Sequence, residues 1–222
     1  MDPVNERADQ DLGQLSYKSS SREYLLPFEA MDILVLNQFI PSHYRPNDAP
    51  LAMVVGYSCI REAEILRAFH EDSFGLTPSA LKVVGCNIGE RPSAGTTDSI
   101  DKLYMGHYEG DARDSFTWFK PLVDLGFEDR LTYDLAYIRN PDLYDVRDWG
   151  AVFAQAVERT CETGVVATLV RRDDIHRFDR LTKHLKSQYD LDPLLVTETG
   201  MNLEDDPLKQ HFLLALFQGQ AK

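Results

Sequence analysis

Short apolar runs recur along most of the chain, and each has the length of a buried strand. They lie at residues 51–56, 81–88, 133–141, 165–170, 193–199 and 211–219, with a shorter candidate around 107–112. Runs of this length, rich in Val, Leu and Ile, are typical of strands that are covered on both faces. They predict the strands of a mostly parallel sheet.

The segments between these runs carry apolar residues at helical spacing. Helices are predicted over 27–39, 59–72, 149–162 and 174–189, with Gly164 closing the third, and a helix interrupted by Pro121 is predicted over 116–127. Residues 89–105 predict a loop that opens into a short helix. Strands and helices that alternate in this way form an α/β fold with helices on both faces of the sheet.

The end of the chain departs from this alternation. Residues 200–210 separate the last two apolar runs and hold turn-forming residues such as Gly200 and Pro207. A parallel crossover needs a dozen or more residues and usually a helix, so the last strand is predicted to run antiparallel to its neighbours. The predicted fold is therefore α/β, doubly wound and Rossmann-like, with a mostly parallel sheet of the seven-stranded type and an antiparallel C-terminal hairpin strand.

Composition favours one domain that follows a flexible N-terminal arm. The chain has 222 residues, 43% of them hydrophobic, which is enough for one sizeable core. Residues 1–22 are polar and cannot bury much surface, which predicts a flexible N-terminal arm. Residues 23–222 are predicted to form a single domain, with a cap helix at about 27–39.

The charge balance narrows the partners. Asp and Glu total 36 against 23 Lys and Arg, a formal net charge of -13, which argues against general nucleic-acid binding because that needs a basic surface. Basic residues do cluster between Arg171 and Lys186, but Asp173, Asp174 and Asp179 lie among them, and a solvated helix face is the favoured interpretation.

No apolar run approaches the roughly 20 residues of a membrane span, and the first ten residues lack the features of a secretory leader. A cytoplasmic protein without membrane contact is expected. The three cysteines, Cys59, Cys86 and Cys161, are odd in number and far apart, so neither disulfides nor a metal site is expected.

Candidate chemistry lies in the loops that follow the predicted strands, because ligands of open α/β sheets bind beyond the carboxyl ends of the strands. Gly56 ends the first strand just before a helix, where a glycine permits a tight turn and close approach to a ligand. Asn87 stands at the tip of the second strand, where its amide would hydrogen-bond a ribose hydroxyl. In the third loop, Asp111 is a candidate for accepting from the amine of an adenine, with Ala112 leaving room for the ring, although a turn-forming role of Asp111 is the favoured interpretation when it is taken alone.

The succession LAMVVGYSCIREAEIL, LKVVGCNIGE, YEGDARD and YDLAYIRNP, with its closing strand pair, resembles the class I methyltransferases that use S-adenosylmethionine. The resemblance covers residues 50–219 and lies in strand order and loop position. It implies S-adenosylmethionine as cofactor and a cofactor-binding set of Gly56, Tyr57, Ser58, Asn87, Ile88, Asp111, Ala112 and Arg139.

The chain also departs from the family pattern in the first two loops. The family has an acidic residue followed by three glycines at alternate positions, whereas here Val54 replaces the acid and Ser58 and Ile60 replace two glycines. An amide, Asn87, stands where the family has a ribose-binding acid. Asp111 with Ala112 is the best-kept piece, since it resembles the adenine-contacting pair of the family.

The resemblance implies methyl transfer to an unidentified acceptor, with a small molecule or a protein favoured. Family members that methylate amines carry an Asn-Pro-Pro-aromatic motif after the fourth strand, but here Asp142 follows Asn140 and Pro141. No catalytic residue is assigned. His43 and Tyr44, just before the first strand, are candidates for closing over the cofactor, although a surface turn is the favoured interpretation.

Two other functions stay open. The altered first loop and the acidic surface are consistent with a methyltransferase-like module that has lost catalysis and acts in binding or regulation. A nicotinamide-dependent oxidoreductase is a distant third, because only one glycine of its G-x-G-x-x-G motif is present. Neither the acceptor nor the oligomeric state follows from the sequence.

Overall fold

Seven strands form one sheet in the computed structural model, which describes residues 27–56, 61–77, 79–87, 106–127, 130–139, 141, 143–171, 174–199 and 212–221. The sheet order is β3-β2-β1-β4-β5-β7-β6. The strands are β1 (Leu51–Val55), β2 (Lys82–Asn87), β3 (Gly106–Glu109), β4 (Tyr133–Arg139), β5 (Thr160–Arg171), β6 (Leu195–Thr199) and β7 (Phe212–Gln218). Strands β1 to β5 pair in parallel, and β7 is antiparallel to both β5 and β6. The predicted fold class, including its reversed last strand, is confirmed.

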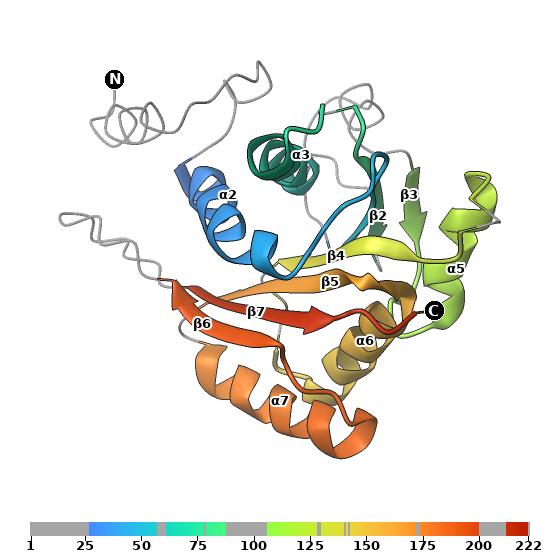
Figure 1. Cartoon of the computed structure of the whole chain (residues 1–222). Coiled ribbons are helices and arrows are strands. Elements are labelled where there is room, and N and C mark those ends of the chain that lie inside the picture. The colour runs from blue at the N-terminus through green and yellow to red at the C-terminus, as the bar shows by residue number, and fades with distance from the viewer. Residues whose placement is uncertain are drawn as a thin grey trace.

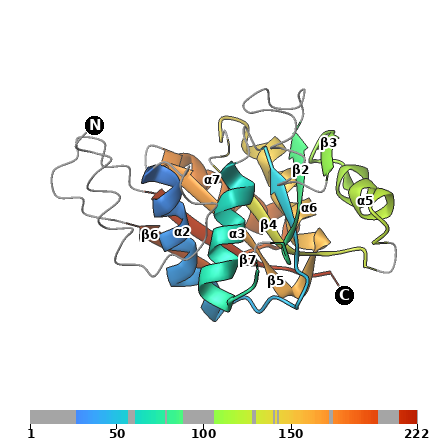
Figure 2. The same cartoon turned by 90° about the horizontal axis from the view of Figure 1, so that it is seen from above.

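Helices cover both faces of this sheet (Figures 1 and 2). They are α2 (Pro27–Phe39), the short 3-10 helix η2 (Ile40–Ser42), α3 (Arg61–Phe74), α5 (Ser115–Asp124), α6 (Val146–Arg159) and α7 (Ile175–Tyr189). Helices α2 and α3 lie side by side on one face, whereas α5, α6 and α7 contribute to the apolar cluster on the other.

The two apolar clusters follow from the period of two along each strand. On β4, Leu135 and Tyr137 are buried under α2 and α3, while Ala136 and Ile138 are buried under the opposite helices. A central strand must therefore be apolar at successive positions, which explains the unbroken runs in the sequence.

The order of the strands reverses between β1 and β4. The chain moves from β1 outward through β2 to β3, then crosses back to β4 and continues outward in the other direction through β5. At such a point the loops after two neighbouring strands diverge to opposite faces and leave a crevice at the carboxyl edge. The loops after β1 and β4 meet this condition.

Two details of the predicted helices were wrong. Pro121 lies inside α5, which continues past it to Asp124, so the predicted interruption is not observed. Helix α6 ends at Arg159 rather than near Gly164, and β5 begins at Thr160. Gly164 lies within β5, where a Cβ would come within 2.3 Å of the Asp134 carbonyl, so the strand needs a glycine there.

The predicted cap helix forms part of the core. Ile33 and Leu36 of α2 are fully buried in the cluster with α3 and the sheet. The predicted arm at 1–22 and the loop and helix at 89–105 lie outside the described residues. Within the described part of the chain, no helix is long and apolar enough to cross a membrane.

Candidate active site

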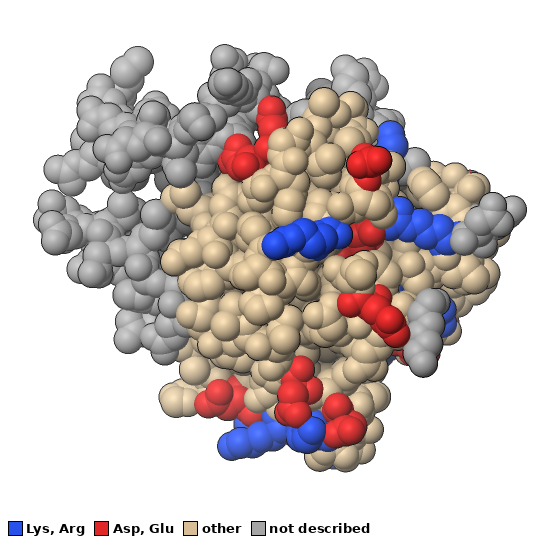
Figure 3. Space-filling model, in the orientation of Figure 1, with Lys and Arg blue, Asp and Glu red and all other residues tan. Residues whose placement is uncertain are grey.

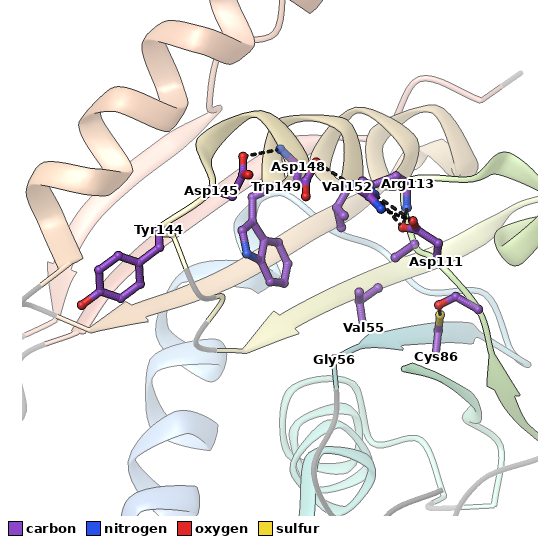
Figure 4. Close-up of a pocket in the computed structure, with 12 residues that line it drawn as sticks. Val55, Gly56, Cys86, Asp111, Arg113, Tyr144, Asp145, Asp148, Trp149 and Val152 are labelled. Atoms are coloured by element: carbon purple, nitrogen blue, oxygen red, sulfur yellow. Dashed lines mark hydrogen bonds and ion pairs between the residues drawn. The ribbon is translucent and has the colours of Figure 1, made fainter. Parts of the chain in front are cut away.

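A pocket of about 350 Å³ opens at the carboxyl edge of the sheet (Figure 4). Its walls come from the ends of β1 and β2, from the loop after β3, and from the loop and helix after β4. The lining residues are Val55, Gly56, Cys86, Gly110, Asp111, Ala112, Arg113, Tyr144, Asp145, Asp148, Trp149 and Val152. The pocket thus lies at the reversal of strand order, where ligands of open α/β sheets bind.

Hydrogen bonds join the ends of the first strands. The Gly56 N–H donates to the Cys86 carbonyl at 2.8 Å, and the Cys86 thiol lies 3.7 Å from the Gly110 carbonyl. Gly56 has a positive φ of 70°, and a Cβ there would meet no atom of the described residues within 4 Å. The backbone turn therefore favours a glycine at this position.

Hydrogen bonds to helix α5 hold the loop after β3 in place. The Trp118 indole N–H, on α5, donates to the Ala112 carbonyl at 2.8 Å. Asp114 caps α5 by accepting from the Phe116 N–H at 3.0 Å. Ala112 itself is 5% exposed, so its small side chain forms part of the pocket floor.

Arg113 connects two walls of the pocket. Its guanidinium donates through Nε to both Asp111 carboxylate oxygens, at 2.9 and 2.8 Å, and pairs through Nη1 with Asp148 of α6 at 2.6 Å. The hydrogen bonds from Arg113 lower the pKa of the Asp111 carboxyl, which is therefore ionised at neutral pH. Figure 4 shows this bridge at one end of the pocket.

Helix α6 supplies the apolar wall opposite the strand ends. Asp145 caps its first turn by accepting from the backbone N–H groups of Arg147 and Asp148, at 3.0 and 3.1 Å. Trp149 and Val152, three residues apart on the same helix face, line the pocket, and the Trp149 indole points from the helix toward the strand ends (Figure 4). Tyr144, just before the helix, lies over the Arg177 guanidinium at 3.7 Å.

The Cys86 side chain is a neutral part of this wall. Burial raises the pKa of its thiol to about 12, with a smaller contribution from the Asp111 charge. The group is therefore a thiol rather than a reactive thiolate at neutral pH.

Three of the predicted cofactor residues, Gly56, Asp111 and Ala112, meet in this pocket. The backbone of Asn87 ends β2 beside Glu109. Tyr57, Ser58 and Ile88 lie outside the described residues.

Arg139 is placed differently. It ends β4, but it does not line the pocket, and its Nε donates to buried Asp32 of α2 at 2.6 Å. The geometry therefore gives no support to the prediction that Arg139 binds the cofactor. The position of Arg139 at the end of β4 does not reveal its pairing with Asp32.

Tyr44 also lies elsewhere. It is 1% exposed, and its hydroxyl is 3.0 Å from His70 Nε2 in the core under α3. The favoured interpretation of a surface turn is wrong for Tyr44, and so is the candidate role of closing over a cofactor, because the apolar cluster on that face encloses its ring. Among the described residues, no group of three or more His, Cys, Asp or Glu side chains is arranged to hold a metal ion.

The sequence interpretation missed the contribution of α6. Trp149 and Val152 had been assigned to a helix without a role, although an i, i+3 apolar pair at the start of a helix after a central strand was a usable signal. Arg113 was equally visible beside Asp111, but its pairing with Asp148 joins residues 35 positions apart in the chain.

Comparison with solved structures finds the same architecture in methyltransferases. The chain is similar to the N-methyltransferase NodS from Bradyrhizobium japonicum, with a TM-score of 0.53 and 13% identity over 87% of this chain and 97% of that one. It is also similar to an rRNA methylase from Streptococcus thermophilus, with a TM-score of 0.51 and 13% identity over 85% and 97% of the two chains. The chain has the methyltransferase fold.

A third similar methyltransferase was solved with a cofactor. An O-methyltransferase of neocarzinostatin biosynthesis, in complex with S-adenosylmethionine and a naphthoic acid, has a TM-score of 0.50 and 13% identity, over 86% of this chain and 57% of that chain. No family model and no curated protein sequence matches the chain. At these identities the comparisons establish the fold alone.

Proposed function

We propose that this protein binds S-adenosylmethionine in the pocket at the end of β1 and transfers its methyl group to an acceptor. One observation carries the proposal: Gly56 from the loop after β1, and Asp111 and Ala112 from the loop after β3, line one pocket at the reversal of strand order. The methyltransferase fold supports it.

The residues present fit an adenine ring. Val55, Ala112, Trp149 and Val152, with the neutral Cys86 thiol, form an apolar slot for a flat heterocycle. Asp111 lies at the end of this slot with an ionised carboxylate. The Asp111 carboxylate accepts four hydrogen bonds from the backbone N–H and the guanidinium of Arg113, so an adenine amine would take the place of one of them.

The rest of the adenosyl group would extend toward the first two strands. Gly56, where a Cβ would meet no atom of the described residues within 4 Å, is proposed to face the part of the ligand beyond the ribose. Asn87 ends the neighbouring strand, and its amide is proposed to accept a hydrogen bond from one ribose hydroxyl. Tyr57, Ser58 and Ile88 are proposed to complete this end of the site.

The cofactor, when bound, supplies an already activated methyl group on a sulfonium. The chain then has to bind and orient the two reactants and exclude water, so no acid and base pair is required of its side chains. Among the described residues that line the pocket, three acids, Asp111, Asp145 and Asp148, stand against one base, Arg113, and this excess favours a ligand of positive charge. A small molecule or a protein side chain is the proposed acceptor.

A thermal-shift series tests the proposal. A ligand that binds only the native state raises the melting temperature by mass action, so S-adenosylmethionine and S-adenosylhomocysteine are expected to raise it and NAD is not. A shift with NAD alone would favour an oxidoreductase. No shift with either sulfur compound at millimolar concentration would reject the cofactor site.

The second candidate is a non-catalytic module on the same fold. The first loop favours this candidate, because Val54, Ser58 and Ile60 stand in place of the acid and two glycines of the family. A β-branched Ile60 would narrow the cofactor pocket. Saturable cofactor binding without methyl transfer to any tested acceptor would support this alternative.

A further inference from the structure

A second, polar pocket lies between α6 and α7, and nothing in the proposed function uses it. Its volume is about 480 Å³, and its lining residues are Arg147, His184, Gln188 and Tyr189. Arg147 belongs to the same first turn of α6 as Asp148 and Trp149, but it lines this pocket instead of the first. The two pockets therefore share a helix and differ in their walls.

The glycine at position 150 allows the His184 ring to pack against α6. A Cβ at Gly150 would come within 2.6 Å of His184 Cδ2 and 3.0 Å of His184 Nε2, so the imidazole lies directly against the backbone of α6. The Tyr189 ring meets His184 edge-on, with 6.0 Å between ring centroids. These contacts fix two of the four lining side chains.

All four lining side chains can donate hydrogen bonds, and none is a carboxylate. Within the described part of the chain, neither the Arg147 guanidinium nor the His184 ring has a hydrogen-bond or ion-pair partner. Arg113, Arg130, Arg139 and Arg177, by contrast, are each paired with an aspartate.

The acids around the pocket are already engaged. Asp145 caps α6, and Asp148 pairs with Arg113. Beyond the end of α7, Asp190 and Asp192 both pair with Lys186, at 2.8 and 2.6 Å. Figure 3 shows acidic and basic side chains interspersed along the lower edge of the molecule, where α7 lies in Figure 1. Each of these four carboxylates thus already accepts from a donor outside the pocket lining or from the backbone of α6.

We propose that this pocket binds the phosphate group of a small phosphorylated molecule. A planar guanidinium binds two phosphate oxygens at once, and imidazole, amide and phenol donors reach the remaining oxygen from other directions. The volume exceeds that of a phosphate group alone, which leaves room for the rest of a small ligand. A long polyanion is disfavoured, because the overall negative charge repels it.

Titration of the full-length protein with inorganic phosphate and with glycerol 3-phosphate tests this site. Binding is followed by the NMR signals of histidine side chains, with sodium chloride at matched ionic strength as the reference. The expected result is saturable shifts of the His184 signal with phosphate and none with chloride. Tighter binding of glycerol 3-phosphate would identify a phosphomonoester as the ligand, and equal or tighter binding of inorganic phosphate would identify the free ion.

Two variants with the same charge change separate the pocket from general attraction. Arg147→Gln removes the proposed anchor and is expected to weaken phosphate binding by at least about tenfold, because hydrogen bonds from a charged donor are lost. Lys183→Gln removes an exposed cation of α7 outside the pocket and is expected to change binding by less than about twofold.

Equal losses in the two variants, or no saturable phosphate binding at tens of millimolar, would overturn the proposal. So would saturable binding of a short single-stranded RNA by a protein that ignores phosphate. None of these results depends on whether the first pocket binds S-adenosylmethionine.

Discussion

Removing the Asp111 carboxylate is expected to weaken cofactor binding by a definite amount. The side chain of Asp111 is 36% exposed, so water competes for it and the gain is below that of a buried charged hydrogen bond. From a usual range of about 1.5–3 kcal/mol, we expect Asp111→Ala to lose about 1–2 kcal/mol. That loss corresponds to an increase of about 5- to 30-fold in the Kd of S-adenosylhomocysteine.

Isothermal titration calorimetry measures this change directly. Asp124→Ala is the matched control, because Asp124 is a partly exposed acid that pairs with Lys120 on α5 and lies outside the pocket. Asp111→Asn keeps a neutral acceptor of the same shape and should lose less than Asp111→Ala. Arg113→Gln leaves the carboxylate in place and should also lose less.

A Kd within twofold of the wild-type value for Asp111→Ala would refute the reasoning. Losses of equal size in Asp111→Ala and Asp124→Ala would refute it as well, since general charge and not an adenine contact would then explain the effect.

Three further outcomes follow from the structure. Burial lowers the pKa of His70 to about 4, below the unfolded value near 6.5. Between these two values the unfolded state binds more protons than the folded state, so the folded state loses stability as the pH falls. Chemical denaturation should show that the free energy of unfolding decreases by about 2 kcal/mol between about pH 7 and about pH 5, and this decrease should be largely absent in His70→Leu. Asp134 is buried and accepts from Leu51 N–H at 2.6 Å and Asn47 Nδ2 at 3.0 Å, so Asp134→Ala should lower the free energy of unfolding by about 3 kcal/mol, and a loss below about 1 kcal/mol would contradict that role. Because acids predominate around the first pocket, added sodium chloride should weaken binding of the cationic S-adenosylmethionine more than that of S-adenosylhomocysteine; identical salt dependence by calorimetry would speak against this electrostatic preference.

Local patterns in the sequence were sufficient to predict the layers and the last strand. The apolar runs identified the strands because burial on both faces demands unbroken hydrophobicity. The short connection at 200–210 predicted the reversal of β7 because no crossover helix fits in it. The predicted boundary between α6 and β5 was wrong for a different reason. Strand β5 pairs with β4 at Thr160 and again from Val165, with a register shift between the two, and this irregularity depends on contacts with β4.

The pocket could be predicted in part for the same reason. The loops that follow parallel strands lie at the same edge of the sheet, so the placement of Gly56 and Asp111 at one site could be predicted from strand order alone. The pairing of Arg139 with Asp32 joins β4 to a helix 107 positions earlier, and no local pattern encodes such a contact. The Arg113 bridge to Asp148 is of the same kind.

The claim that an adenosyl group binds against α6 has a direct optical test. Trp149 lines the pocket, whereas Trp118, the only other tryptophan of the chain, belongs to α5 and is fully buried. Titration with S-adenosylhomocysteine should quench tryptophan emission saturably, because the adenine would stack near the Trp149 indole. The quench should be lost in Trp149→Phe, which keeps an aromatic wall and the binding heat. Saturable binding heat with the same emission change in wild type and Trp149→Phe, or no binding at all, would contradict the proposed site.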